Sequence, residues 1–88
     1  MAQTAGRLIY RVSRRTHPNK LAAAIIGAVK DGREIDCLAI GGRALDNLIF
    51  ALCIADRVLK GDVFCRFAFS DPEKRDSNFR VKATVGIG

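Results

Sequence analysis

The chain alternates twice between a strand-like and a helix-like segment, and this alternation is the feature that most restricts its fold. Residues 7–13 (RLIYRVS) place apolar side chains at every second position, which is typical of a β-strand with one buried face. Helical periodicity follows from Pro18 to Gly32, with proline at the favoured first position and glycine past the end. Residues 34–40 (EIDCLAI) are nearly continuously apolar, as in an inner strand. A second helix is expected over residues 44–60, ended by Gly61.

The rest of the chain predicts a β-hairpin. Residues 62–70 and 79–87 alternate between apolar and polar positions, and the polar segment 71–78 (DPEKRDSN) between them is rich in turn formers. The element order is therefore β-α-β-α-β-β. Because crossovers between parallel strands are right-handed, both helices should cover one face of the sheet. We expect an α/β (α+β two-layer) fold in which a four-stranded mixed sheet carries two helices on one face.

The length and composition indicate one globular domain in a reducing compartment. A chain of 88 residues allows a single domain, which we expect over residues 7–88, after a flexible N-terminal tail at residues 1–6. The three cysteines form no CxxC pair and lie in apolar stretches, so we expect structural thiols and no metal or other cofactor. No signal peptide is visible, and the longest apolar run, residues 48–55, is too short to cross a bilayer. We expect a cytoplasmic protein without a membrane partner.

The charge balance favours a polyanionic partner. The formal net charge is +6 and the sequence pI is about 9.8. Such an excess on a small domain attracts polyanions and speeds their encounter with it. The alternative is that the charge serves solubility alone.

Two helix starts are expected to converge on one edge of the sheet. In a parallel β-α-β-α arrangement both helices begin beyond the carboxyl ends of the first two strands, and their unpaired N–H groups attract anions. The residues expected at this edge are Arg14, Arg15, His17, Asn19, Gly41, Gly42 and Arg43. Alternatives stay open for three features: the glycine pair as a tight turn, Asn19 as a local cap, and His17 as a surface residue flanking the helix. The sequence therefore predicts a phosphate-binding edge.

Catalysis is not expected. Ser13 lacks a GxSxG elbow, the cysteines lie in apolar segments, and residues 41–43 match neither a P-loop nor a full GxGxxG motif. No pair of carboxylates suggests a glycosidase-type cleft. The protein is predicted not to be an enzyme.

The second helix is apolar over a wider arc than a helix on a sheet needs. The residues that can cover the sheet are Ala44, Leu48, Ala51, Ala55 and Val58. The apolar residues then left over are Leu45, Ile49, Leu52 and Leu59 on one flank of the helix, with Phe50 and Cys53 beyond them. Exposed apolar patches mark interfaces, so we predict a homodimer packed through this helix, with a higher oligomer left open. The alternative is that the first helix covers this flank.

The chain resembles a known bacterial family. The stretches that carry the resemblance are VSRRTHPNKLAAAI, EIDCLAIGGRALDN and DVFCRFAFSDP. They resemble the stage V sporulation protein S family from about Tyr10 to Val85. That family is similar to the archaeal chromatin protein Alba, whose β-α-β-α-β-β fold inserts the last strand between the second and third.

The resemblance implies a dimer that binds DNA or RNA. The implied contacts are Arg14, Arg15, Pro18 and Asn19 at the first helix start, Gly42 and Arg43 at the second, and Lys74 and Arg75 in the hairpin. Asp71, Glu73 and Asp76 cancel the hairpin charge, which favours the helix-start edge as the binding surface.

The function predicted from the sequence is therefore that of a small basic dimeric nucleic-acid-binding protein. The family resemblance implies a bacterial developmental, sporulation-type regulator, which could be nucleoid-associated. One alternative is a non-catalytic protein-interaction or structural module that acts through oligomerisation. Another is a site for a small anionic ligand at the Gly41–Gly42 turn.

Overall fold

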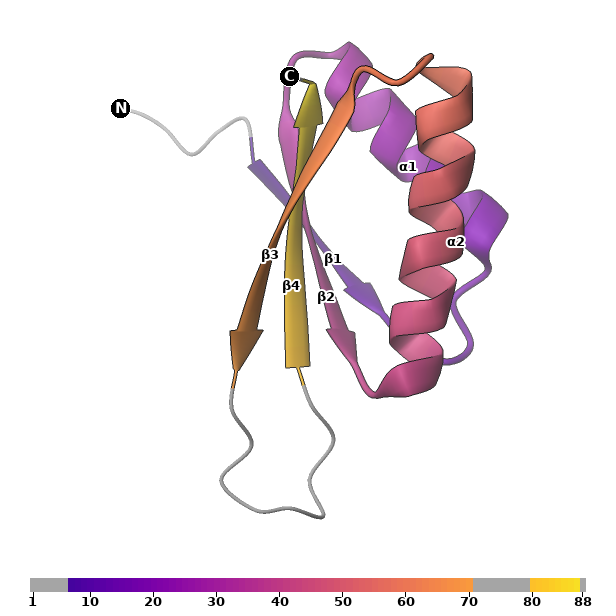
Figure 1. Cartoon of the computed structure of the whole chain (residues 1–88), viewed down its shortest axis with the longest axis vertical. Helices are drawn as coiled ribbons and strands as arrows, with labels where there is room; N and C mark the ends of the chain where they lie inside the picture. The colour runs from indigo at the N-terminus through magenta and orange to yellow at the C-terminus, as the bar shows by residue number, and fades with distance from the viewer. Residues whose placement is uncertain (1–6, 71–79, 88) are drawn as a thin grey trace.

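The fold is a two-layer α+β domain, seen in a computed structural model that describes residues 7–70 and 80–87 (Figure 1). The elements are β1 (Arg7–Val12), α1 (Pro18–Lys30), β2 (Glu34–Ile40), α2 (Gly42–Val58), β3 (Val63–Ser70) and β4 (Arg80–Ile87). The predicted element order is confirmed, whereas the tail expected at residues 1–6 lies outside the described residues. The second helix begins and ends two residues earlier than predicted.

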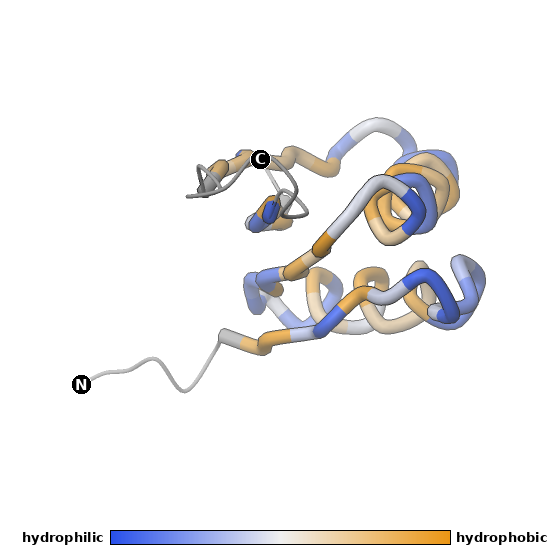
Figure 2. The backbone as a smooth tube through the Cα atoms, turned by 90° about the horizontal axis from the view of Figure 1, so that it is seen from below, coloured by the Kyte–Doolittle hydropathy of each residue, from blue (hydrophilic) through white to orange (hydrophobic). Residues whose placement is uncertain are grey.

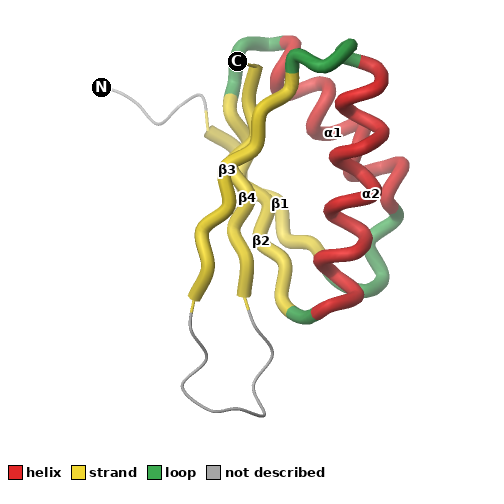
Figure 3. The backbone as a smooth tube through the Cα atoms, viewed as in Figure 1, coloured by secondary structure: helices red, strands yellow, loops and turns green. Residues whose placement is uncertain are grey.

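The sheet has four strands in the order β1-β2-β4-β3. β1 runs parallel to β2, and β4 runs antiparallel to both β2 and β3. The last strand therefore lies between the second and third, as the family resemblance implied. Both helices form a separate layer on one side of this sheet (Figure 3), so the predicted mixed sheet with two helices on one face is confirmed.

The hydrophobic core lies between the two layers. Figure 2 shows hydrophobic residues along the strands and along both helices. The largest side chains that are fully buried there are Leu21, Ile25, Val29, Ile35, Cys37, Leu48 and Val85. Alternate residues of β2 and β4 supply the sheet side of the core, because successive strand residues point to opposite faces. The two inner strands of the sheet are thus fixed by burial as well as by hydrogen bonds.

α2 covers the sheet with a face of mostly small side chains. Its buried residues are Ala44, Leu48, Ala51 and Ala55. The prediction that Val58 also covers the sheet is wrong, since 49% of its surface is exposed. The helix ends at Val58, and the half-buried side chain of the next residue, Leu59, packs against the core instead.

The three cysteines differ in their environments. Cys37 is buried in the core, and burial, reinforced by the nearby Cys65 and Asp36, raises the pKa of its thiol to about 12. Burial also raises the pKa of Cys65. Cys53 is exposed on α2. Because the thiolate is the reactive form, Cys37 and Cys65 behave as structural thiols, and Cys53 is the cysteine open to reagents.

In the described part of the chain, no helix has the length and apolarity needed to cross a membrane. Within the same residues, no cluster of three His, Cys, Asp or Glu side chains could hold a metal ion.

Candidate functional site at the helix-start edge

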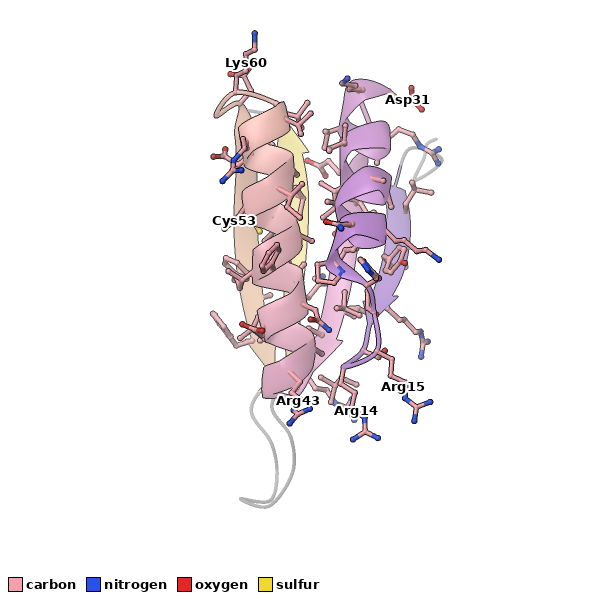
Figure 4. The ribbon with its side chains drawn as sticks, turned by 90° about the vertical axis from the view of Figure 1, so that its right-hand side faces the viewer. Arg14, Arg15, Asp31, Arg43, Cys53 and Lys60 are labelled. Atoms are coloured by element: carbon pink, nitrogen blue, oxygen red, sulfur yellow. The ribbon has the colours of Figure 1, made fainter. Side chains whose placement is uncertain are left out.

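A pocket opens at the edge where β1 and β2 end and both helices begin. Its volume is about 530 Å³. The lining residues are Arg11, Val12, Ser13, Arg14, Leu38, Ile40, Gly41, Gly42, Arg43 and Ala44. Both turns contribute to it, so the expected meeting of the two helix starts at one edge is what the structure shows. Arg14, Arg15 and Arg43 extend from this end of the molecule (Figure 4).

The turn between β1 and α1 is held by its own short side chains. The backbone N–H of Ser13 donates to Thr16 Oγ1 at 2.8 Å, and the Thr16 N–H donates back to the Ser13 carbonyl at 3.1 Å. The Arg15 N–H donates to Ser13 Oγ at 3.1 Å. These bonds form a compact turn of the kind that Ser and Thr favour. The turn fixes the backbone of Arg14 and Arg15 while both side chains stay exposed.

Asn47 of α2 joins this turn to the second helix. Its Nδ2 atom donates to the carbonyl of Ser13 at 3.1 Å and to that of Arg14 at 3.2 Å. The contact spans more than thirty residues of sequence, so nothing local predicted it. The only signal in the sequence is the amide itself, in a helix whose other polar side chains are all charged. Asn47 is therefore a positioning residue that sets the β1–α1 turn against the start of α2.

The two helix starts differ in how their N–H groups are satisfied. His17 caps α1, because its Nδ1 atom accepts a hydrogen bond from the Asn19 N–H at 3.2 Å. His17 thus fits the alternative from the sequence, in which it is a surface residue flanking the first helix. Gly41 caps α2 without any side-chain hydrogen bond, and the first turn of α2 contains no acidic residue. The first N–H groups of α2 consequently remain the more available for an anion.

The two glycines of the second turn have different roles. Gly41 is buried and has a φ of 91°, a conformation that favours glycine over residues with a Cβ atom. A Cβ atom at Gly42 would meet nothing within 4 Å. Gly41 therefore fits the alternative in which glycine is needed for a tight turn. Gly42, in contrast, leaves open space beside the pocket.

Positive charge gathers around the pocket. Arg11, Arg14 and Arg43 line it, and Arg15 follows in the same turn. In the ranges 7–70 and 80–87, no hydrogen bond or ion pair occupies these four guanidinium groups. Sequence reasoning missed Arg11, which reaches the pocket because β1 ends there. His17 and Asn19, although predicted for the site, lie outside the pocket lining.

The chain matches the family model described as Stage V sporulation protein S (SpoVS) over residues 8–85. It belongs to the SpoVS family. The match covers nearly the whole chain and confirms the resemblance found in the sequence. Membership relates this small protein to sporulation. No curated protein matches the chain.

The remaining predicted contacts of this SpoVS-family chain concern the hairpin and α2. Lys74 and Arg75 lie outside the described residues. On α2, Leu45 and Leu52 are half-buried and pack against the protein's own core. Asn47 reaches the turn before α1, and at 3.6 residues per turn Leu45 and Leu52 lie roughly 140–160° away from it around the helix. Leu45 and Leu52 therefore lie on the side of α2 that faces away from the β1–α1 turn.

The outward side of α2 carries the apolar surface that remains. Ile49, Phe50 and Cys53 are exposed, with exposed fractions of 41% for Ile49 and 59% for Phe50. They line a shallow depression of about 350 Å³ together with Asp46, Ile54 and Arg57. We refer to Ile49, Phe50, Cys53 and Ile54 as the α2 apolar patch.

Proposed function

We propose that this SpoVS-family protein is a non-catalytic regulator that binds DNA or RNA through phosphate contacts at the helix-start edge. The observation that carries the proposal is the pocket lined by Arg11, Arg14 and Arg43 beside the uncapped start of α2. Arginine presents a planar fork of donors that matches a phosphate group, and the α2 N–H groups add donors on the adjoining wall. A backbone phosphate is the ligand that satisfies both features.

The chemistry of the lining favours backbone contacts over base recognition. Besides its arginines, the pocket presents aliphatic side chains such as Val12, Leu38 and Ile40, and none of the described residues that line it is aromatic. Base stacking needs an aromatic or comparable flat surface, whereas phosphate contacts need cations and N–H groups. We therefore expect binding at this edge to depend little on sequence.

The direct test is a salt titration of the wild-type protein. Fluorescence anisotropy against labelled duplex DNA, single-stranded DNA and RNA should show the affinity falling steeply as salt rises. Four arginine–phosphate contacts on duplex DNA, from Arg11, Arg14, Arg15 and Arg43, predict a slope of log K against log salt of about −3.6, because each contact contributes about −0.9. A flat salt response, or no binding to any of the three, would contradict the proposal.

We further propose that the protein acts as a homodimer that meets through the α2 apolar patch. Apolar residues with the exposure of Phe50 and Ile49 on one helix face are typical of an interface. Two copies would present two arginine-lined edges to one nucleic acid, which raises the apparent affinity by linking two binding events. The same patch also supports the alternative of an interaction module that acts through oligomerisation alone.

Replacing Phe50 by glutamate should convert the dimer into a monomer. The side chain is mostly exposed in one copy, so the change leaves the fold intact but places a charge inside the interface. Light scattering should report half the wild-type mass, and Cys53 should react faster with a thiol reagent in the variant. Ile9→Glu is the matched control, because Ile9 is 68% exposed on the far side of the sheet. A wild-type protein that is monomeric at every concentration would refute the dimer.

A further inference from the structure

The side of the sheet that faces away from the helices is open. Both helices lie on the opposite side, and no described element covers this one (Figures 1 and 3). Its residues are those that alternate with the core positions along each strand. The residues of this open sheet face are Ile9 and Arg11 of β1, Glu34, Asp36, Leu38 and Ile40 of β2, Phe64, Arg66 and Ala68 of β3, and Arg80, Lys82 and Thr84 of β4.

Exposed cations dominate this face. Arg11, Arg66, Arg80 and Lys82 are all exposed, and no hydrogen bond or ion pair with another described residue occupies their charged groups. The carboxylate of Asp36 is withdrawn from solvent, since the residue is only 5% exposed and accepts a hydrogen bond from Thr84 Oγ1 at 2.8 Å. Glu34 adds an exposed carboxylate at the end of β2 far from the pocket, with its Cγ atom 3.5 Å from the Cβ position of Gly86. The four cations outnumber it, so the charge that the face presents to a partner is positive, and the complementary partner is a polyanion.

The strand register connects these cations to the arginine-lined pocket. Arg11 lines the pocket and lies opposite Leu38, which lies opposite Lys82 on the next strand. Thr84 follows Lys82 on the same face of β4, further from the helix-start edge, and it lies opposite Arg66 on β3. Arg80 pairs with Ile40 at the end of β2, next to the pocket. Positive charge thus continues from the helix-start edge across the face to Arg66.

An aromatic ring lies at the far end of this series. Phe64 comes two residues before Arg66 on β3 and is 37% exposed. Its ring lies over Gly86 of β4, where an added Cβ atom would come within 3.0 Å of the Phe64 Cε1 atom. The missing side chain of Gly86 therefore lets the ring rest on the backbone and keeps it in place.

We infer that the open sheet face binds a single strand of nucleic acid that continues from the helix-start edge. Arg66 and Lys82 contact its phosphates and Phe64 stacks on a base. Duplex nucleic acid buries its bases, so it cannot use Phe64 or the exposed aliphatic residues between the cations. A single strand offers both phosphates and free base faces, which is the combination that cations with a neighbouring ring recognise. This inference rests on the proposed nucleic-acid binding and specifies its substrate.

The first test removes the two cations that lie away from the pocket. In the variant Arg66→Gln with Lys82→Gln, the slope of log K against log salt for single-stranded DNA should become shallower by about 1.4. Over the tenfold range from ~1 M to ~0.1 M salt, this difference corresponds to an affinity about 25-fold lower at ~0.1 M. Duplex affinity should stay close to that of the wild type. The matched control is Lys30→Gln with Lys60→Gln, which removes the same charge from exposed positions at and just after the ends of the two helices, away from both the open sheet face and the α2 apolar patch.

The second test reports on Phe64 itself. The chain contains no tryptophan, so Phe64→Trp places a single indole on the open sheet face. Val58→Trp places one on α2 as a control, because Val58 is 49% exposed and lies outside the α2 apolar patch. Saturating single-stranded DNA should quench the fluorescence of the first variant and leave that of the second nearly unchanged. Poly-glutamate serves as a polyanion without bases and should cause no comparable quenching.

The outcomes separate this inference from the proposed function. The inference is overturned if the Arg66 and Lys82 changes weaken binding no more than the control changes do. That result would leave binding at the helix-start edge standing. Equal binding of poly-glutamate and single-stranded DNA also overturns it, in favour of an acidic protein partner. A wild-type protein that binds no nucleic acid overturns both.

Discussion

Replacing Arg14, Arg15 and Arg43 by glutamate is expected to lower the affinity for DNA and RNA by at least about a hundredfold at ~0.1 M salt. Arg14 and Arg43 line the pocket and Arg15 lies in the same turn. Each lost phosphate contact removes about 0.9 from the salt slope on duplex DNA, so three losses account for about 2.7. The reversed charges also repel the phosphates. Fluorescence anisotropy over a range of salt concentrations measures both effects.

A control with the same change in net charge shows whether position matters. Lys30, Arg57 and Lys60 are exposed cations at or just after the ends of the helices. Figure 4 shows Lys60 at the opposite end of the molecule from the three arginines. Replacing Lys30, Arg57 and Lys60 by glutamate should weaken nucleic-acid binding far less than replacing the three arginines. Each change costs roughly 0.3–1 kcal/mol at a helix C-terminus, so circular dichroism must first show that the variant is folded. Light scattering must also show the wild-type mass, because Arg57 lines the depression at the α2 apolar patch. Equal losses in both triple variants would mean that net charge alone, and no particular edge, determines binding.

Shortening Leu48 to alanine is expected to destabilise the fold by about 2–5 kcal/mol. Leu48 is fully buried, and its neighbours on the buried face of α2 are alanines, so it is the large side chain that fills the space between α2 and the sheet. A small domain has a free energy of unfolding of only about 5–15 kcal/mol, so the variant should unfold at a much lower urea concentration.

Val58→Ala is the comparison that makes this result informative. Val58 lies on the same helix but is 49% exposed, and such a surface substitution changes the free energy of unfolding by only about 0.5 kcal/mol. Urea titrations of both variants should use one protein concentration, because the stability of a dimer depends on concentration. Similar losses for Leu48→Ala and Val58→Ala would show that Val58 does belong to the core, as its sequence position suggested.

The secondary structure and strand order could be predicted because their signals are local or follow from chain connectivity. Pro18 starts the first helix, and glycines with positive φ at positions 32 and 61 follow the two helices, as the sequence indicated. Period-two alternation marked the strands, and right-handed crossovers then placed both helices on one face. The ends of α2 were less well predicted, since a long apolar segment does not mark where helical hydrogen bonding stops.

Burial on the second helix and on β3 was only partly predictable. Phe67 and Phe69 alternate with the same period as Val63 and Cys65, which are half-buried and pack against the core. Phe69 is nevertheless 74% exposed and stacks on Phe67 with ring centroids 6.4 Å apart. β3 is an edge strand, so a matching period does not guarantee that another layer covers each position. The period of a strand predicts which face of the sheet a side chain lies on. Its burial depends on whether another element packs against that face at that position.

The two helix starts show most clearly what sequence alone determined and what the tertiary structure decided. The sequence determined that both would meet at one edge, and that Arg14, Arg15 and Arg43 would be there, because parallel β-α units place every helix start beyond the carboxyl end of a strand. Only the tertiary structure brought Arg11 into the pocket, used His17 as a cap and tied the first turn to Asn47. These features depend on side chains from different elements meeting in space. Their contacts follow from packing between helices and sheet, for which the sequence carries no local signal.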